Sequence, residues 1–342
     1  MAMNKLREEL AQAFISSLNE GEIPWEATWK TSRPENAVTG KAYRGVNSLW
    51  LSMLSACKGY TDPRWCTFNQ AKESGWSVRK GEKSAHIEFW SLYDKKTKKT
   101  VSRADAVRIV DADPDRKDDI ILMSRTYCVF NAAQIDGIPE PEVVPRTDIG
   151  ELRAKRDLLL KNMCLGFREE GDRAYYTPSM DRVTLPPEES FYDVYGYMAT
   201  FLHECGHATG HETRLNRDLS GAFGSEKYAK EELRAEIASA FTAQALGLTD
   251  GHAGRAGDID NHKAYIQSWA QTIKSDPNEL FAAIRDAEKI SDYLLEKGEF
   301  FIELGPIEPT VSTKPSLDSQ IHAATGRRGR KSNNHNQERE GR

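Results

Sequence analysis

Hydrophobic residues recur at helical spacing from the start of the chain. Leu6, Leu10, Phe14 and Leu18 repeat with a period near 3.6 residues, which predicts a helix over residues 4–19. The stretch that follows is rich in glycine, proline and other turn-forming residues. It predicts an extended segment and then a loop or hairpin.

The rest of the first half mixes helical and strand patterns. Residues 47–60 and 68–75 predict two helices, each closed by a glycine, and residues 85–93 predict a strand. Residues 94–124 are charged and irregular, and they predict a long hairpin loop or insertion. Residues 125–137 predict a second strand that runs into a short helix. The first half is therefore expected to be α+β.

Helical patterns dominate the second half. Helices are predicted over residues 150–163, 191–211, 228–247, 261–276 and 278–297. The alternation over residues 173–187 predicts a strand at an exposed sheet edge. We therefore expect an α+β protein, in which an N-terminal α+β domain precedes a mainly helical domain with a small sheet.

Shifts in composition mark the expected domain boundaries. The proline-rich stretch at residues 139–148 is typical of a linker, which we set at residues 140–149. It separates an N-terminal domain, residues 1–139, from a second domain, residues 150–305. Proline, serine, asparagine and arginine dominate the end of the chain, and they predict a disordered basic tail over residues 306–342.

The overall composition fits a cytoplasmic protein. Hydrophobic residues make up 39% and charged residues 29% of the chain, and no apolar run is long enough to span a membrane. The N-terminal stretch lacks the apolar core of a signal peptide. Five cysteines without CxxC spacing indicate reduced thiols rather than a disulfide framework: Cys57, Cys66, Cys128, Cys164 and Cys205.

The net charge of −5 hides an asymmetry between the two halves. Residues 28–108 carry 16 basic against 7 acidic residues, whereas residues 140–305 carry 19 against 30. Six of the seven tryptophans lie in the first 90 residues. Two domains with different partners explain this division better than one domain does.

The second half contains an HExxH motif, formed by His203, Glu204 and His207. On a helix, residues four apart lie on the same face, so the two imidazoles can converge on one ion. Zn²⁺ at an open site lowers the pKa of a bound water, and a neighbouring carboxylate can remove its proton. The apolar residues before the motif predict a buried helix, and the small Gly206 and Ala208 are expected to keep the metal side open.

A catalytic zinc needs a third protein ligand. Thr213 breaks the spacing HExxHxxGxxH, which excludes that ligand pattern. Glu232 and Glu236 lie four apart on the next strong helix, and we predict Glu232 as the ligand and Glu236 as acceptor for a histidine N–H. The two roles can be exchanged, and His211 is an alternative ligand. Mn²⁺ or another divalent metal could replace zinc.

Aromatic and basic residues alternate in the first half. Aromatic faces stack on unpaired bases while cations follow the phosphates, so the pattern suits single-stranded DNA with little sequence specificity. About half of the tryptophans are expected to be core residues instead. The candidate contacts are Trp25, Trp29, Lys30, Lys41, Tyr43, Arg44, Asn47, Arg64, Trp65, Lys72, Arg79, Lys80 and Lys83.

Several stretches resemble the ArdC-type antirestriction proteins of conjugative plasmids and phages. In the first half they are IPWEATWK, TGKAYRGVN, WCTFNQAKESGWSVRKGEKSAHIEFW and YCVFNAAQIDG, and in the second YMATFLHECGHATGHETRLNR, FGSEKYAKEELRAEIASAF and NHKAYIQSW. The resemblance runs over about residues 5–300 and implies an N-terminal single-stranded DNA-binding domain, shared with some plasmid TraC primases, and a zincin-like metallopeptidase domain. It also implies His203 and His207 as ligands, Glu204 as catalytic acid/base, and protection of incoming DNA. A primase would need a further catalytic domain, and none is expected here.

Three functions are compatible with these features. The first is a DNA-tethered zinc metallopeptidase whose protein substrate is a host restriction component or another nearby protein. The second is a non-catalytic protein that coats single-stranded DNA and has a structural zinc. The third is a metal-dependent nuclease, which is disfavoured because HExxH on a helix suits zinc hydrolysis of carbonyls.

Overall fold

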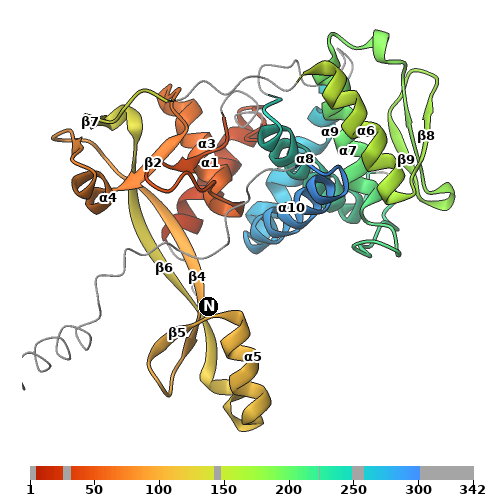
Figure 1. Ribbon diagram of the computed structural model, residues 1–342. Coiled ribbons are helices and arrows are strands. Elements are labelled where there is room, and N and C mark those ends of the chain that lie inside the picture. Colours follow the sequence, from red (N-terminus) through yellow and green to blue (C-terminus); the bar gives the residue numbers. More distant parts are fainter. Residues whose placement is uncertain (1–4, 26–31, 142–147, 223, 249–257, 301–342) are drawn as a thin grey trace, which may run out of the picture. The chain divides into compact units, whose positions relative to one another are not determined.

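The computed structural model describes residues 5–25, 32–141, 148–222, 224–248 and 258–300, with side chains from residue 6 onward and not for residues 258–265. The predicted basic tail, and the predicted DNA contacts Trp29 and Lys30, lie outside these residues. Helices and small sheets alternate along the chain (Figure 1), so the predicted α+β class is confirmed. No helix among the described residues is both long and apolar enough to cross a membrane.

The largest sheet has five strands in the order β1-β2-β6-β4-β5. Its strands are β1 (Glu35–Asn36), β2 (Arg64–Thr67), β4 (Ala85–Asp94), β5 (Lys99–Val101) and β6 (Ile120–Asn131). β4 and β6 pair antiparallel without interruption, from Ala85 opposite Val129 to Asp94 opposite Ile120. This long ribbon extends away from the other strands, and β5 lies at its far end (Figure 1).

The far end of the ribbon corrects the prediction of an irregular loop over residues 94–124. A short helix, α5 (Arg103–Ala112), and a 3₁₀ turn (Pro114–Asp119) fill it. Ser102 caps α5 by accepting a hydrogen bond from the backbone N–H of Asp105 at 3.1 Å. Hydrophobic periodicity missed α5 because only Ala106 among its residues is buried.

The described residues of the first half also include three helices and a small two-stranded antiparallel sheet. These elements are α1 (Lys5–Asn19), α3 (Gly45–Lys58), α4 (Phe68–Glu73), and β3 (Ser77–Val78) paired with β7 (Ile135–Asp136). The four periodic positions of α1 are all buried, as their spacing predicts. Gly59 ends α3 in the left-handed conformation, with φ of 68°, which explains the glycine at this position.

Five α-helices and a three-stranded sheet account for most of the described residues of the second half. The helices are α6 (Ile149–Met163), α7 (Val194–Ala208), α8 (Glu226–Ala245), α9 (Asp258–Ser275) and α10 (Asn278–Lys297). The strands are β8 (Gly166–Glu169), β9 (Tyr175–Thr177) and β10 (Arg182–Leu185), in the order β8-β10-β9. The predicted edge strand at residues 173–187 is therefore two strands, of which β10 is central and β9 is at the edge.

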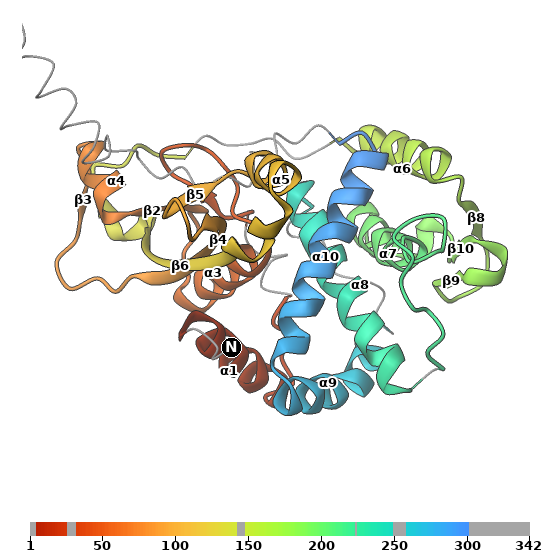
Figure 2. The same ribbon diagram turned by 90° about the horizontal axis from the view of Figure 1, so that it is seen from below.

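Residues from both halves share one hydrophobic core. α10 packs against α3 of the first half and against α6, α7, α8 and α9 of the second (Figure 2). α1 packs against α9. All five cysteines, each in a described part of the chain, are free thiols, as predicted. The boundary at residues 140–149 stays a prediction, because residues 142–147 lie outside the described chain.

Candidate metal centre

α7 presents the HExxH motif from the interior of the second half. The Asp193 side chain caps the helix by accepting a hydrogen bond from the Gly196 N–H at 2.7 Å. Phe201 and Leu202, immediately before the motif, are fully buried. The apolar residues that precede His203 thus anchor the helix in the core, and the imidazoles of His203 and His207 face Glu232 of the neighbouring α8.

α8 lies close enough to α7 to complete the motif with a carboxylate. A Cβ placed on Gly206 would stand 3.7 Å from the Ala235 Cα, which is an ordinary van der Waals distance, so the backbone of α7 at Gly206 lies close to α8. The expectation that Gly206 keeps the metal side open stays a prediction. The close approach places Glu232 opposite the two histidines.

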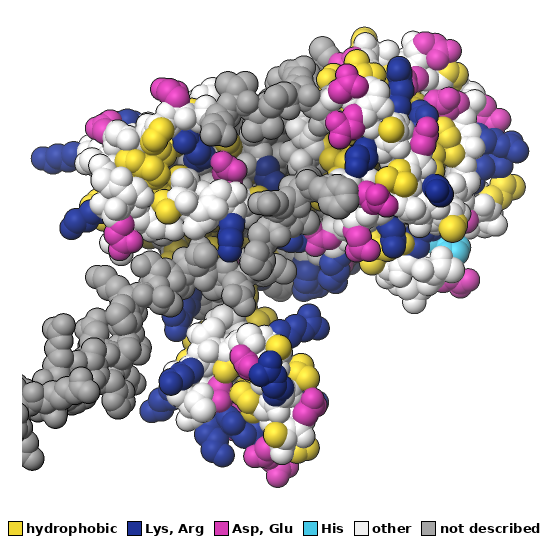
Figure 3. Space-filling model, viewed as in Figure 1, with side chains coloured by type: hydrophobic (Ala, Val, Ile, Leu, Met, Phe, Trp, Pro, Cys, Tyr) yellow, Lys and Arg dark blue, Asp and Glu magenta, His cyan; other side chains and the backbone are white. Residues whose placement is uncertain are grey.

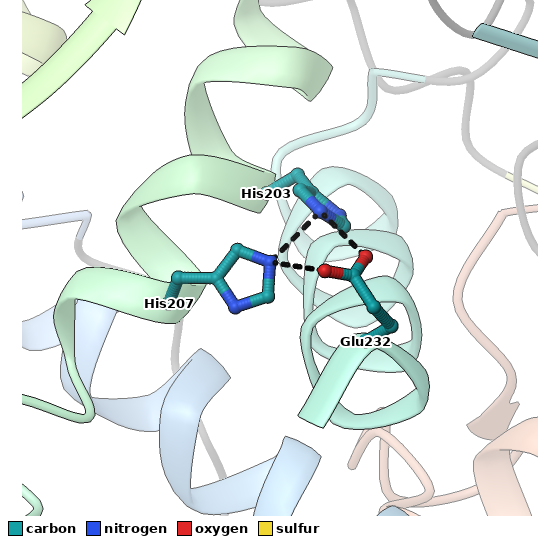
Figure 4. A group of neighbouring side chains, drawn as sticks. All are labelled: His203, His207 and Glu232. Atoms are coloured by element: carbon teal, nitrogen blue, oxygen red, sulfur yellow. Dashed lines mark hydrogen bonds and ion pairs between the residues drawn. The ribbon is translucent and has the colours of Figure 1, made fainter. Parts of the chain in front are cut away.

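Three side chains meet between the helices (Figure 4). The Nε2 atoms of His203 and His207 are 3.2 Å apart. One Glu232 oxygen lies 3.6 Å from Nε2 of His203, and the other lies 3.4 Å from Nε2 of His207. These three residues form a group of potential metal ligands whose donor atoms all lie within 4.8 Å of one another.

The spacing of these donors fits a small divalent ion. Ligands about 2.1 Å from a tetrahedral ion are about 3.4 Å from one another, close to the 3.2 Å between the two Nε2 atoms, and one Glu232 oxygen would complete the set within 4.8 Å. Two imidazoles and one carboxylate are a ligand set that zinc accepts at a catalytic site, where a fourth position stays open. The donor chemistry and the geometry therefore both suit a divalent metal.

The outer nitrogen of each imidazole faces a further carboxylate. Nδ1 of His203 lies 3.7 Å from Glu236, and Nδ1 of His207 lies 3.5 Å from Glu231. Such carboxylates fix the tautomer and the ring orientation, so that each Nε2 points to the ion. The positions of Glu232 and Glu236 agree with the roles predicted for them, and these roles remain predictions. Glu231 was missed, although it is the residue next to Glu232.

The carboxylates also set the charge of the cluster. Burial opposes a charge on both imidazoles, but Glu236 near His203 and Glu232 near His207 outweigh it and raise the pKa of each. Burial raises the pKa of Glu204, although the neighbouring His203 and His207 act in the opposite direction. A site with this many carboxylates attracts a cation.

Two arginines secure the end of α7 beyond the motif. Arg214 donates to the Ala208 carbonyl at 2.9 Å, and Arg217 donates to the Gly206 carbonyl at 2.8 Å. Arg217 also donates two hydrogen bonds to Glu231, at 2.6 and 3.2 Å. Cations at a helix C-terminus satisfy its last carbonyls, so these arginines hold the last turn of α7 in place.

His211 does not join the cluster. It lies in the turn after α7, and its Nδ1 is 2.9 Å from the Thr213 hydroxyl. α7 ends at Ala208, so the face shared by His203 and His207 does not continue to residue 211. The alternative assignment of His211 as a metal ligand is therefore not supported by this arrangement.

The predicted DNA contacts divide into buried and exposed groups. Trp25 and Trp65 are 1% exposed, and Tyr43 and Asn47 are also buried. We therefore withdraw these four as DNA contacts, because a base cannot reach a ring or an amide enclosed in the core. Asn47 instead donates to the Glu88 carbonyl at 2.7 Å and accepts from the Glu88 N–H at 2.9 Å.

Three of the predicted arginines form ion pairs within the protein. Arg44 binds Glu288 and Asp292 of α10, Arg64 binds Asp62, and Arg79 binds Glu82 and Asp136. A phosphate would have to compete with these carboxylates. Arg44 and Arg64 are therefore weaker candidates for contacts with DNA phosphates, because most of each side chain is also shielded from solvent.

The lysines of the predicted set are more accessible. Lys72, Lys80 and Lys83 are exposed and Lys41 is partly exposed, and none of the four has an ion-pair partner in the described part of the chain. Figure 3 shows Lys and Arg side chains at the outer margin of the region around α4 and β7. Phe68, which is 54% exposed on α4, was missed although it lies one helical turn before Lys72.

Comparison with known proteins identifies both halves. Residues 154–286 match the family described as zincin-like metallopeptidase, and residues 4–130 match the N-terminal domain of anti-restriction factor ArdC. Two crystal structures of the antirestriction ArdC protein from plasmid R388, one metal-free and one with Mn(II) bound, are 32% and 33% identical in sequence. Each matches 87% of this chain and 100% of its own, with a TM-score of 0.66. The chain belongs to the ArdC family of antirestriction proteins.

The chain is also similar to segments of much longer proteins. Two proteins named DNA primase TraC, both from Escherichia coli, are 40% and 38% identical over 84% of the chain, which spans 27% and 20% of their lengths. An uncharacterized protein, y4eC of Sinorhizobium fredii, is 35% identical over 85% of the chain and 90% of its own length. The zincin-like domain and the Mn(II)-bound ArdC structure together indicate a divalent metal in this family.

Proposed function

We propose that this ArdC-family protein binds single-stranded DNA in the cytoplasm and protects DNA of a mobile element from host restriction with a metallopeptidase site. The observation that carries the proposal is the convergence of His203, His207 and Glu232 beside the buried Glu204. The metal that suits this ligand set best is Zn²⁺, and Mn²⁺ is the alternative. The protein substrate that fits this role is a component of the host restriction system.

The residues of the site divide the chemistry among them. His203, His207 and Glu232 would hold the ion, which when bound polarises a carbonyl and makes a water more acidic. Glu204 would remove the proton of the attacking water and deliver it to the leaving amine nitrogen. Glu204 is 7% exposed, so bulk water has little access to the carboxylate that would carry out this proton transfer.

Replacing Glu204 with glutamine tests whether this chemistry protects DNA. The variant keeps the size of the side chain and cannot take a proton, so we expect protein cleavage and protection from restriction to fall by at least about 10²-fold. Metal content should stay at the wild-type level, because Glu204 is not among the three residues proposed as ligands. The measurements are metal analysis and plating efficiency of restricted DNA, made side by side for both proteins.

The same experiment decides between catalysis and coating. If Glu204→Gln protects DNA as well as the wild type does, the protein acts by covering single strands and its metal is structural. Protection by the wild type that disappears in Glu204→Gln, with metal retained, would exclude coating as a sufficient mechanism.

The exposed lysines of the first half support the DNA-binding part of the proposal. We assign the contacts to Phe68, Lys72, Lys80 and Lys83, with Lys41 at the margin, while Trp29 and Lys30 remain predictions. Phe68 offers a ring on which a base can stack, and the lysines offer charge to the phosphates. Removing residues 1–139 would not test this cleanly, because it would take away α1, which packs on α9.

Replacing Lys72, Lys80 and Lys83 together with alanine should weaken binding to single-stranded DNA. Removing one lysine–phosphate pair lowers the slope of log K against log salt by about 0.7, so the triple variant should reduce the slope by up to about 2. Phe68→Ala should cost about 1–3 kcal/mol of binding with no change of slope. Fluorescence anisotropy with a labelled oligonucleotide over a salt series measures both effects.

A matched triple variant controls for net charge. Lys161, Lys227 and Lys274 are exposed lysines of the second half, and their replacement by alanine removes the same charge. DNA affinity should change little in this control. An equal loss of affinity in the two triple variants would contradict the assigned face.

A further inference from the structure

Trp25 comes from the first half of the chain but lies beside helices of the second half. Its side chain is 1% exposed. The ring centroid lies 5.7 Å from that of Phe14 on α1 and 5.0 Å from that of Trp269 on α9. Trp269 in turn donates its indole N–H to the Ala229 carbonyl of α8 at 2.8 Å. The aromatic group therefore connects α1 to α8 and α9.

The polar end of Trp25 points to the surroundings of the metal centre. Its indole N–H donates to one oxygen of Glu236 at 3.2 Å. The other oxygen of Glu236 lies 3.7 Å from Nδ1 of His203. Glu236 is itself 5% exposed, so water contributes little to holding its carboxylate. The two oxygens thus link a tryptophan of the first half to a histidine of the candidate metal site.

His207 is also held by a series of contacts, but these contacts come from a different part of the sequence. Nδ1 of His207 faces Glu231, and Arg217 holds Glu231 with two hydrogen bonds. Both of these residues belong to the second half. The two imidazoles are therefore oriented in the same manner, but among the described residues only the support of His203 includes one from the first half.

We propose that Trp25 is a positioning residue of the metal centre. Its N–H fixes one Glu236 oxygen, so that the other oxygen orients His203 and directs Nε2 to the ion. A buried carboxylate needs hydrogen-bond donors to keep one orientation, and the loss of a donor lets it rotate. The affinity of the metal site in the second half consequently depends on a segment of the first half.

This dependence is reciprocal. If Trp25 strengthens metal binding, metal binding must stabilise the packing of Trp25 by the same factor. The segment that follows α1 and the metal site are then coupled through three side chains. The inference rests on the metal ion of the proposed function, and it makes no use of peptidase activity.

The test compares metal affinities of variants at Trp25 and at its neighbour. Trp25→Phe keeps a ring in the core and removes the N–H donor. The same donor can be removed with less change of shape by incorporating 3-benzothienylalanine at position 25, in which sulfur replaces the N–H group. Trp269→Phe is the matched control, because this buried indole donates to a backbone carbonyl and not to Glu236. Affinities are measured for Zn²⁺ by competition with a chromophoric chelator and for Mn²⁺ by electron paramagnetic resonance.

We expect both replacements of Trp25 to weaken metal binding by about 3- to 10-fold, which is less than the roughly 10- to 100-fold typical of a direct partner of a metal-binding histidine. Trp269→Phe should stay within about 2-fold of the wild type. In a Glu236→Ala background, Trp25→Phe should cause no further loss, because its effect passes through that carboxylate.

Three results would overturn the inference alone: a wild-type metal affinity with 3-benzothienylalanine at position 25, an equal loss in Trp269→Phe, or an undiminished effect of Trp25→Phe in the Glu236→Ala background. A wild-type protein that binds neither ion would overturn the metal centre of the proposed function, and this inference with it. The two failures are therefore distinguishable.

Discussion

Replacing Glu232 with alanine is expected to lower the affinity for Zn²⁺ and Mn²⁺ by more than about 100-fold, beyond the range seen when an outer partner is lost. The carboxylate places one oxygen opposite each Nε2 of the pair, and nothing else among the described residues supplies a third donor to this group. Two histidines alone bind a divalent ion weakly. Metal content after dialysis and titration with a chelator provide the measurement.

Two further variants separate the possible third ligands. His211→Ala should leave metal affinity near the wild-type value, because this side chain faces Thr213. Glu236→Ala should cause an intermediate loss, since Glu236 contacts the outer nitrogen of His203. If Glu232→Ala retains its metal and Glu236→Ala loses it, then Glu236 is the metal ligand and Glu232 is the residue that contacts the histidine N–H.

Replacing Arg214 with methionine is expected to destabilise the fold by about 2–4 kcal/mol, near the lower end for breaking a buried ion pair because Asp181 is partly solvated. The Arg214 side chain is 3% exposed. It donates to both oxygens of Asp181 at 2.8 and 2.7 Å, and to the carbonyls of Ala208 and Met163. Methionine fills part of the space and leaves these acceptors without the donor. Equilibrium unfolding in urea measures the change.

A surface pair provides the control for this experiment. Arg153 pairs with Glu188 but is 50% exposed, so Arg153→Met should cost at most about 1 kcal/mol. If Arg153→Met lowers the free energy of unfolding as much as Arg214→Met does, burial of the ion pair does not determine how much its loss destabilises the fold.

The Arg214 effect should also depend on pH. Burial favours the neutral form of Asp181, but Arg214 outweighs it and holds the pKa of this carboxyl below its usual 3.8. A carboxyl whose pKa is lower in the folded state stabilises the protein above its unfolded pKa, and this stabilisation is lost as pH falls through the folded pKa. The difference between wild type and Arg214→Met should therefore be constant near neutral pH and shrink below about pH 4.

The elements that could be predicted from the sequence are those fixed by local periodicity. The apolar repeat of α1 and the glycine after α3 specify a helix and its end without reference to the rest of the chain. The HExxH motif is also local, because one helix turn places His203 and His207 side by side. α5 was missed for the same physical reason, since a helix with one buried residue has no hydrophobic repeat to detect.

The candidate DNA contacts could not be resolved by such patterns. A tryptophan near lysines has the same appearance in sequence whether its ring packs in the core, as Trp65 does, or lies in solvent. Phe68 is exposed only because α4 presents it away from the small cluster that contains Ala71. The burial of a large ring depends on tertiary packing, which one sequence does not specify.

The surroundings of the metal site show the same limit. Spacing of four residues relates Glu232 to Glu236, and it says nothing about Glu231, whose contact with His207 depends on how α8 is rotated against α7. Trp25 lies 211 residues before Glu236 in the chain, so their hydrogen bond could not be inferred from proximity in sequence.

The uninterrupted pairing of β4 with β6 has a consequence for how this protein tolerates change. The last pair of the ribbon, Asp94 and Ile120, brackets residues 95–119, and β5 within this segment pairs with only the last three residues of β4, Leu92 to Asp94. Insertions or deletions between these two positions alter the length of a hairpin and leave the chain's path through the core unchanged. The far end of the ribbon is thus a natural place to shorten the protein or to graft a reporter peptide.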